Sequence, residues 1–404
     1  MTNHSAAPSP KRILQIITVF SIGGATASMI NIASGLKLRG YEVEIVTGKN
    51  ISSEGDLFQE ANARGLKVTV LPNFVKEVSP IKDLLTLFQL IRFIKSGSFD
   101  VVHTHTAKAG ILGRLAAYIA NVPTIFHSLH LLSFHRFQHP ILRFVFIFLE
   151  RLVIRFTTKV ISVCQTMINA HLSAGIGKPE QYTVVFNSIQ NKFFSHSLDS
   201  KERLREKFGN SLGIHQNDVV ITNVSRITEL KGQAFILQAA PSIVKSHPEV
   251  KFLFVGGGDY LPRIKEIVTK NNLSQHVILT GVVPPERVVE LLQLSDIICH
   301  TSLHEGLPTV FQEAMALKKP LVSFNLDGAA EVISDGLNGF LIPASPVNDE
   351  TISILEARLI SLIENPSLRI SFGEQAYHKT NPYFTQSYMT DKFLEIYDSA
   401  FQTK

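Results

Sequence analysis

The fold is decided by the stretch Ser302-Leu-His-Glu-Gly-Leu-Pro-Thr-Val-Phe-Gln-Glu-Ala-Met-Ala316. The apolar run 296–300 just before it predicts a buried parallel strand, and residues 307–317 predict a helix. Glu305 would then lie at the carboxyl end of the strand, and Glu313 about two turns into the helix. A helix N-terminus there offers N–H groups and a partial positive charge to an anion, while two carboxylates can accept hydrogen bonds from sugar or ribose hydroxyls. The spacing alone also fits a solvated Glu and a second Glu favoured by the helix dipole.

Strand-length apolar runs alternate with helical segments along the rest of the chain, which predicts an α/β protein with parallel sheets covered on both faces. The rhythm restarts after the polar stretch 195–205, so we expect two doubly wound, Rossmann-like domains with a cleft between them. A length of 404 residues also exceeds that of one ordinary core. The expected strands are residues 12–19, 43–47, 68–71, 101–103, 124–126, 160–163, 219–224, 252–255, 277–279, 297–300 and 321–324.

The composition, 45% hydrophobic and 18% charged, is typical of a soluble globular protein. No apolar stretch approaches the ~18–20 uncharged residues of a membrane span, and the polar residues 1–10 lack the apolar centre of a signal peptide, so we expect a cytoplasmic protein. Cys164 and Cys299 are too few for a disulfide framework and unsuited to a zinc site, and we expect buried thiols. The net charge of +5 does not choose between a membrane, a phosphorylated substrate and nucleic acid.

The residues around the two glutamates, Glu305-Gly-Leu-Pro308 and Gln312-Glu-Ala-Met-Ala316, resemble the signature of retaining glycosyltransferases of family 4. These enzymes have the two-domain architecture called GT-B, in which the two domains face each other across a cleft. The resemblance extends in particular to the enzymes that build bacterial capsule, exopolysaccharide and lipopolysaccharide.

The resemblance covers most of the chain, from Gly23 to Gly339, with five motifs in the order of the family. It implies an acceptor-binding domain over residues 1–190 and a nucleotide-sugar donor-binding domain over residues 195–381. The last helix, residues 382–404, would pack back on the first domain.

Two loops that follow the first strand of each domain carry residues suited to phosphate. Gly23 and Gly24 allow close approach of a ligand to a helix N-terminus, although a plain tight turn has the same pattern. Arg226 and Lys231 stand in one loop and can reach a single anion, or can be two solvated charges. The resemblance assigns Arg226 and Lys231 to the donor diphosphate, with the Gly24 N–H assisting.

The resemblance implies further donor contacts at strand ends. Gly256 opens a glycine-rich turn that borders the nucleotide, and Val282 lies where family members contact the base. Gly306 and Leu307, between the two glutamates, are also expected at the donor. Glu313 would bind the ribose.

The sequence His103-Thr-His105 ends a strand and could suggest a metal site. No carboxylate stands at ligand spacing, so we expect no metal ion. The surrounding residues resemble a segment of the family 4 enzymes. That resemblance places His105 and Lys108 on the acceptor side of the cleft.

A histidine after the next strand is expected near the reacting carbon. Members of the family carry a histidine here that contacts the donor sugar, and the alignment puts His130 at that position. Leu131 departs from the usual Gly or Asp, which leaves His127 as the alternative. The resemblance thus makes His130 and Glu305 the catalytic residues, with Glu305 on the donor-sugar hydroxyls.

Residues 136–156 predict one basic amphipathic helix. Such a helix can lie in a membrane interface, or it can pack its apolar face on the sheet. We favour contact with the anionic inner face of the cell membrane, because the expected acceptor is lipid-linked. At about 100° per residue, the charged residues that fall on one side are Arg136, Arg143, Glu150, Arg151 and Arg155.

The implied reaction moves a hexosyl or N-acetylhexosaminyl group from a nucleoside-diphosphate sugar, expected to be a UDP-sugar, to a hydroxyl of a lipid-linked glycan. The anomeric configuration is retained, and we expect no cofactor, no metal and no nucleic-acid partner. Two alternatives are a UDP-sugar 2-epimerase of the GT-B type and a two-lobed sugar-binding protein without catalysis. A dinucleotide oxidoreductase is disfavoured, because the G-x-G-x-x-G fingerprint is absent.

Overall fold

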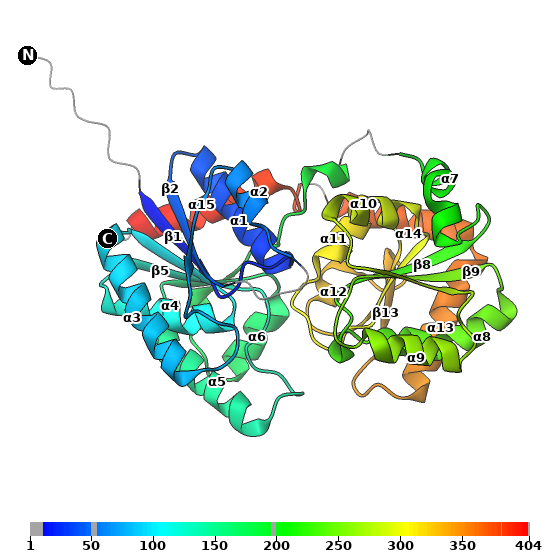
Figure 1. The fold of residues 1–404 in the computed structure, drawn as a ribbon, viewed down its shortest axis with the longest axis horizontal. Coiled ribbons are helices and arrows are strands. Elements are labelled where there is room, and N and C mark those ends of the chain that lie inside the picture. Colours follow the sequence, from blue (N-terminus) through cyan, green and yellow to red (C-terminus); the bar gives the residue numbers. More distant parts are fainter. Residues whose placement is uncertain (1–10, 50–54, 195–198, 381, 403–404) are drawn as a thin grey trace, which may run out of the picture. The chain divides into compact units, whose positions relative to one another are not determined.

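The computed structural model describes residues 11–49, 55–194, 199–380 and 382–402. The chain divides into two compact units. Unit 1 comprises Met1–Ser188 and Gln386–Lys404, and unit 2 comprises Ile189–Thr385. In each unit a parallel sheet lies between two layers of helices (Figure 1).

The sheet of unit 1 has the strand order β3-β2-β1-β4-β5-β6-β7, and every neighbouring pair is parallel. Its strands are β1 (Arg12–Ile17), β2 (Glu42–Gly48), β3 (Lys67–Leu71), β4 (Val101–His105), β5 (Thr124–Leu129), β6 (Lys159–Ser162) and β7 (Tyr182–Val184). Its α-helices are α1 (Gly24–Leu38), α2 (Phe58–Ala63), α3 (Pro80–Gly97), α4 (Ala107–Ile119), α5 (Pro140–Val153), α6 (Gln165–Ser173) and α15 (Gln386–Gln402).

Side chains of β1 alternate between the two faces of this sheet, as the period of two in a strand requires. Ile13 and Ile17 pack among α1, α2 and α15, whereas Leu14 and Ile16 pack among α3 and α4 (Figure 1). All four are buried. Burial of each such side chain contributes roughly 1.5–3 kcal/mol, so both helical layers are held by the same apolar strand.

The C-terminal helix α15 completes the core of unit 1. It packs on α1, and its side chains Met389, Phe393 and Tyr397 are buried in the cluster that contains β1. The two helices approach closely at Gly35, where an added Cβ would lie 2.2 Å from Thr390 Oγ1. Residues from the two ends of the sequence therefore share one hydrophobic core.

The sheet of unit 2 has the order β10-β9-β8-β11-β12-β13 and is also parallel throughout. Its strands are β8 (Val219–Val224), β9 (Val250–Val255), β10 (Val277–Gly281), β11 (Ile297–His300), β12 (Leu321–Phe324) and β13 (Gly339–Ile342). Its α-helices are α7 (Lys201–Leu212), α8 (Gln233–Ser246), α9 (Leu261–Lys270), α10 (Pro285–Leu294), α11 (Thr309–Ala316), α12 (Ala329–Val332), α13 (Asp349–Glu364) and α14 (Pro366–His378).

The predicted fold class, α/β with two doubly wound Rossmann-like domains, is confirmed. The sequence analysis missed the last strand of each sheet, β7 and β13. Both are edge strands of three and four residues, so their apolar signal is weak. Cys164 and Cys299 are buried thiols, as expected.

Candidate active site

Two loops at the carboxyl edge of the second sheet pack against each other through glycines. Gly256 has φ +141°, and an added Cβ would lie 2.1 Å from the carbonyl oxygen of Ser225. Gly258 has φ +156° and stands equally close to the carbonyl oxygen of Ile227. Glycine is needed at both positions. This packing fixes the loop after β8, from which the exposed side chain of Arg226 projects.

Lys231, Glu305 and His300 form a charged cluster at the same edge. Gly232, with φ +70°, brings the loop against β11, because its Cβ position is 2.1 Å from the carbonyl oxygen of Thr301. Lys231 Nζ then donates to Glu305 Oε1, and His300 Nε2 lies 3.1 Å from the same oxygen. Burial opposes ionisation of Glu305, but Lys231 and His300 lower its pKa to about 2. Glu305 is therefore a fixed anionic acceptor at neutral pH.

Glu313 lies on α11, which begins at Thr309, after Pro308, rather than at Leu307 as the sequence suggested. Leu307 is buried, and the carbonyl oxygen of Gly306 accepts from the N–H of Gly328 at 3.0 Å. Burial raises the pKa of Glu313 to about 7, although Lys192 opposes the shift. Glu313 is thus poised between its neutral and anionic forms near pH 7.

The remaining donor-side candidates lie at the ends of strands. Gly23 precedes α1 in an extended conformation, with no atom within 4 Å of an added Cβ, and Gly24 is the first residue of the helix. Val282 follows β10 and is 51% exposed.

Strand register sorts the histidines of unit 1 onto two faces of its sheet. His103 pairs in register with Gln15, and His105 pairs with Ile17, which places both histidines on the face covered by α15. His127 pairs with Thr104 on the opposite face. There it is buried, and its Nδ1 lies 3.0 Å from Thr104 Oγ1.

His130 follows the carboxyl end of β5, where ligands of parallel sheets bind. Its Nε2 lies 2.9 Å from Nδ1 of His105, and its Nδ1 is buried without a hydrogen-bond partner among the described residues. His130 therefore has one ring nitrogen that no described residue occupies.

The two acceptor-side candidates are both engaged with other residues. His105 is fully buried, and its Nε2 lies 2.6 Å from Gln15 Oε1. Lys108, in the first turn of α4, donates to Asp83 Oδ1 at 2.6 Å. Among the residues that the structure describes, no group of three or more His, Cys, Asp or Glu side chains could hold a metal ion.

The basic helix is shorter than the sequence indicated, and one of its charges faces inward. Because α5 spans Pro140–Val153, Arg136 precedes it and Arg155 lies in the following 3-10 turn, Ile154–Phe156. Glu150 is only 1% exposed and accepts from Arg114 Nη2 at 2.6 Å. A buried guanidinium requires such a partner. The five charged residues predicted on one side of the helix therefore do not all lie at the surface, because Glu150 is buried against Arg114.

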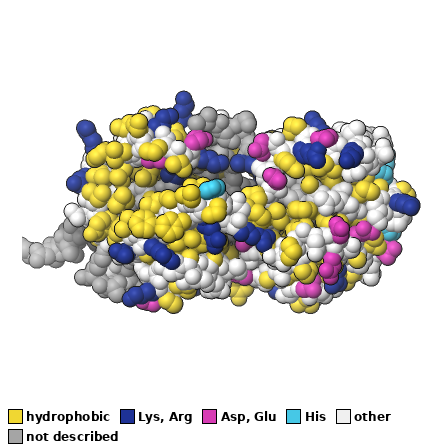
Figure 2. Space-filling view, turned by 90° about the horizontal axis from the view of Figure 1, so that it is seen from below, with side chains coloured by type: hydrophobic (Ala, Val, Ile, Leu, Met, Phe, Trp, Pro, Cys, Tyr) yellow, Lys and Arg dark blue, Asp and Glu magenta, His cyan; other side chains and the backbone are white. Residues whose placement is uncertain are grey.

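The apolar face of α5 is largely exposed, and a second helix extends it. Figure 2 displays hydrophobic side chains gathered on the part of unit 1 that carries α3 and α5, with Lys and Arg among them. The exposed large hydrophobic residues of α3 and α5, together with Val78 just before α3, are Val78, Ile81, Leu84, Leu85, Phe88, Ile141, Leu142, Phe144, Val145, Phe148 and Leu152. We call this set the apolar surface. Within the described residues, no helix has the length and apolar character needed to cross a bilayer.

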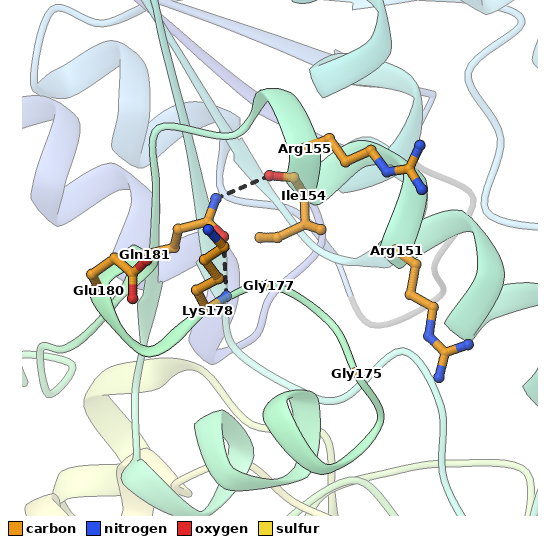
Figure 3. A pocket seen from close by; sticks show the side chains of 8 residues that line it. All are labelled: Arg151, Ile154, Arg155, Gly175, Gly177, Lys178, Glu180 and Gln181. Carbon is orange, nitrogen blue, oxygen red and sulfur yellow. Dashed lines mark hydrogen bonds between the residues drawn. The ribbon is translucent and has the colours of Figure 1, made fainter.

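A basic pocket of about 560 Å³ adjoins the C-terminal end of α5. Figure 3 places Arg151 and Arg155 on one side of it and Lys178, Glu180 and Gln181 on the other. The Nε and Nη2 of Arg151 donate to the carbonyl oxygen of Ala174 at 2.9 and 2.5 Å. Three cations against one carboxylate give the pocket a positive balance.

Comparisons with known proteins identify the family of this chain. The family described as "Glycosyl transferase 4-like domain" matches residues 23–188, and the family described as "Glycosyl transferases group 1" matches residues 205–379. The chain belongs to the GT4-like glycosyltransferases with the GT-B fold.

Two curated glycosyltransferases cover most of the chain. The UDP-Gal:alpha-D-GlcNAc-diphosphoundecaprenol alpha-1,3-galactosyltransferase of Escherichia coli is 28% identical over 69% of this chain and 71% of its own. The N,N'-diacetylbacillosaminyl-diphospho-undecaprenol alpha-1,3-N-acetylgalactosaminyltransferase of Campylobacter jejuni is 26% identical over 91% of this chain and 93% of its own.

A solved structure shares the fold of the glycosyltransferase. HepE of Anabaena, in complex with UDP-glucose, superposes with a TM-score of 0.80 at 22% identity, over 96% of this chain and 99% of its own. At that identity the likeness concerns the fold alone.

Several residues of the site were not found from the sequence. Lys192 and Gln15 contribute through contacts that join distant segments, and His300 contributes through its contact with Glu305 five residues further on. The register of parallel strands could have suggested Gln15, because the side chains of paired residues point to the same face. Tyr397, which contacts Gln15 from α15, carries no local signal.

The buried histidines predict a loss of stability in mild acid. Burial lowers the pKa of each of them below its ordinary value. Above pH 6.5 they are neutral whether the chain is folded or unfolded, but between pH 6.5 and about 4 the unfolded chain binds more protons. The free energy of unfolding should therefore fall by several kcal/mol from pH 7 to pH 5, at roughly 1.4 kcal/mol per pH unit for each group. The histidines are His103, His105, His127, His130 and His171.

Urea unfolding followed by circular dichroism would measure this difference, since the chain contains no Trp. Glu313, with its raised pKa, acts in the opposite direction, but it is one group against five. His171→Phe is the matched variant, and it should shrink the difference between pH 7 and pH 5 by about 2 kcal/mol. Equal stability at the two pH values would contradict the assignment of neutral buried histidines.

Proposed function

We propose that this glycosyltransferase transfers a sugar from a UDP-sugar to a hydroxyl of a lipid-linked glycan, with retention of the anomeric configuration. One observation carries the proposal. The carboxyl edge of the second sheet gathers Arg226, Lys231 and two glutamates around the start of α11. This set offers cations to a diphosphate and carboxylates to the hydroxyls of the sugar and ribose.

The donor is held through its charged and hydroxyl groups. Arg226 and Lys231 bind the diphosphate, with the N–H of Gly24 assisting. Glu313 accepts from the ribose hydroxyls, and Glu305 from hydroxyls of the donor sugar. Lys231 is paired with Glu305, so a bound diphosphate would replace or share that contact.

The backbone near the strand ends completes the donor site. Gly23, Gly256, Gly306 and Leu307 border the nucleotide sugar, and Val282 borders the base. A glycine such as Gly256, which is already packed on the loop after β8, lets main-chain groups approach the ligand.

The reaction exchanges one bond at the anomeric carbon for another. The bond from that carbon to the diphosphate oxygen breaks, and a bond to the acceptor oxygen forms on the same face. The acceptor proton passes to a phosphate oxygen of the leaving group. Arg226 and Lys231 stabilise the charge that develops there, so that no metal ion is needed. His130 and Glu305 orient the donor sugar.

The relatives support a lipid-linked acceptor. The names of the Escherichia coli and Campylobacter jejuni enzymes give sugars on diphosphoundecaprenol as the acceptors. Both names also specify an alpha linkage. By this analogy the glycosyltransferase acts in the synthesis of a bacterial surface polysaccharide or lipopolysaccharide, with Lys108 and the segment around His105 on the acceptor side.

Incubation with radiolabelled nucleotide sugars and a bacterial membrane extract, with and without excess chelator, tests this function. We expect label from one UDP-sugar in the lipid fraction under both conditions. Label in an altered free sugar nucleotide would instead identify a 2-epimerase, and an unchanged donor would identify a binding protein. A strict requirement for magnesium would contradict the metal-free step.

Replacing either donor-site cation should slow the reaction strongly. We expect Arg226→Ala and Lys231→Ala each to lower turnover by at least ~10²-fold, which is typical for the loss of a contact to transition-state charge. Steady-state kinetics with the accepted donor would measure it. Lys270→Ala, which removes a lysine at the end of α9, is the control and should keep parental turnover. Normal turnover in both site variants would refute the diphosphate assignment.

A lipid-linked acceptor would lie in a membrane, which the apolar surface could contact. We propose that α3 and α5 rest on the inner face of the cell membrane, where apolar side chains enter the interface and basic residues meet anionic headgroups. Arg143 lies on α5 beside exposed Phe144, and the basic pocket near Arg151 adjoins the same helix. This arrangement would hold a cytoplasmic enzyme at the membrane without a spanning helix.

Removing apolar side chains from α5 should release the protein from vesicles. Ile141, Phe144 and Phe148 are 69%, 67% and 58% exposed, so replacing all three with Ser should leave the core intact. We expect at least a ~10-fold loss of co-sedimentation with anionic vesicles, because each side chain contributes roughly 1.5–3 kcal/mol when fully buried. Turnover on a soluble acceptor analogue should persist.

Ile370→Ser is the matched control, since Ile370 is 67% exposed on α14 of the other unit. Replacing Arg136, Arg143 and Arg155 with Gln should weaken binding to anionic vesicles at low salt, and the effect should fade as salt screens the charges. Equal co-sedimentation of the triple Ser variant and the parent would rule out this surface.

A further inference from the structure

A chain of hydrogen bonds within unit 1 connects the C-terminal helix to His130. Gln15 Nε2 on β1 lies 3.4 Å from Tyr397 Oη on α15, and Gln15 Oε1 lies 2.6 Å from His105 Nε2. His105 Nδ1 in turn lies 2.9 Å from His130 Nε2. The proposed reaction assigns no task to Gln15 or Tyr397.

The side chains in this series of contacts are buried, so the position of each hydrogen affects the hydrogen bonding of the neighbouring side chain. Gln15, His105 and Tyr397 are all fully buried. Burial also lowers the pKa of His105 well below its ordinary value and that of His130 to about 4, so both imidazoles are neutral at pH 7. A neutral imidazole has one nitrogen that donates a hydrogen bond and one that accepts. The role of one ring nitrogen therefore determines the role of the other.

The direction of the hydrogen bonds follows from the carbonyl oxygen of Gln15. That oxygen can only accept, so Nε2 of His105 carries the hydrogen and Nδ1 of His105 has the lone pair. Nδ1 of His105 therefore accepts a hydrogen bond, and the donor is the N–H at Nε2 of His130. The remaining nitrogen of His130, Nδ1, is then an acceptor.

Tyr397 holds the amide of Gln15 in this orientation. Its hydroxyl accepts from the NH₂ of Gln15. The hydrogen of the hydroxyl is then left for Nδ1 of His103, which lies 2.7 Å away. His103 passes its own hydrogen from Nε2 to Ser128 Oγ at 2.8 Å. With the NH₂ group engaged by Tyr397, the carbonyl oxygen of Gln15 faces His105.

The chain of contacts ends at an acceptor without a partner. Nδ1 of His130 is buried and makes no hydrogen bond to any described residue. A buried polar atom in that state is destabilising, and a ligand hydroxyl would satisfy it. We propose that Gln15, His105 and Tyr397 are positioning residues that hold His130 as the Nε2–H tautomer, so that Nδ1 accepts a hydrogen bond from a hydroxyl of the donor sugar. The identity of the ligand rests on the proposed function, whereas the tautomer does not.

Nuclear magnetic resonance can observe the tautomer directly. Long-range ¹H–¹⁵N correlation on the full chain with ¹⁵N-labelled histidine identifies which ring nitrogen carries the hydrogen, and His130→Phe assigns the signals by their loss. We expect Nε2–H in the parent protein without ligand. A hydrogen on Nδ1 of His130 would overturn the proposal.

Two variants test the positioning residues. In Gln15→Leu, Nε2 of His105 loses its acceptor, so His105 should donate from Nδ1 and the hydrogen of His130 should move to Nδ1. Tyr397→Phe should give a mixture of tautomers, because the amide of Gln15 is no longer oriented. Thr104→Val is the matched control, since it removes a buried hydrogen bond of His127 on the opposite face of the sheet. An unchanged His130 in the first two variants, or a changed one in the control, would contradict the assignment.

Kinetics separate positioning from damage to the fold. With a UDP-sugar, Gln15→Leu should lower kcat/KM on the order of tenfold, the value of one hydrogen bond. The Kd for UDP should stay the same, because UDP lacks the donor sugar whose hydroxyl would bind His130. A parallel loss of UDP binding would contradict a positioning role. If the parent has the expected tautomer but turns over no nucleotide sugar, the proposed function fails and the tautomer assignment stands.

Discussion

The parallel direction of every strand pair is the constraint on which the rest of the structure depends. In both sheets it sends all carboxyl ends to one edge, where the loops after β8, β9 and β11 meet in unit 2 and the segment after β5 begins in unit 1. Parallel strands need crossover connections, which here are helices. Their N-termini arrive at the same edge, so anion-binding N–H groups and polar side chains collect there without further design.

Glycines allow the loops at this edge to make contact at backbone distance. Gly232, Gly256 and Gly258 each place a Cα where any side chain would meet a carbonyl oxygen. The electrostatics then follow from proximity, since Lys231 and His300 keep Glu305 ionised despite its burial. Burial raises the pKa of Glu313, against the opposing effect of Lys192. Two carboxylates eight residues apart thus differ in charge because their neighbours differ.

Much of the fold and part of the site could be predicted from the sequence. Buried parallel strands are apolar along their whole length, so the central strands were found, whereas the short edge strands β7 and β13 were not. The family resemblance supplied roles for Arg226, Lys231 and Glu313, and these roles stay predictions. The chain's membership of the GT4-like glycosyltransferases is confirmed.

What could not be predicted depends on contacts between distant segments. Glu150 belongs by helical periodicity with the surface arginines, but a buried Arg114 from α4 draws it inward. His105 appeared as a candidate for the acceptor, yet it is buried and its Nε2 contacts Gln15 of β1, which in turn contacts Tyr397 of α15. Periodicity and motif spacing do not contain the packing of α15 on unit 1, which the family resemblance alone implied.

The configuration of the product shows whether glycosyl transfer proceeds with retention. The enzyme would be given an α-linked UDP-sugar labelled with ¹³C at the anomeric carbon and the lipid-linked acceptor, and the product would be observed by nuclear magnetic resonance. We expect the label to appear in an α-glycoside of the acceptor. A β-glycoside, or label released only as free sugar, would contradict it.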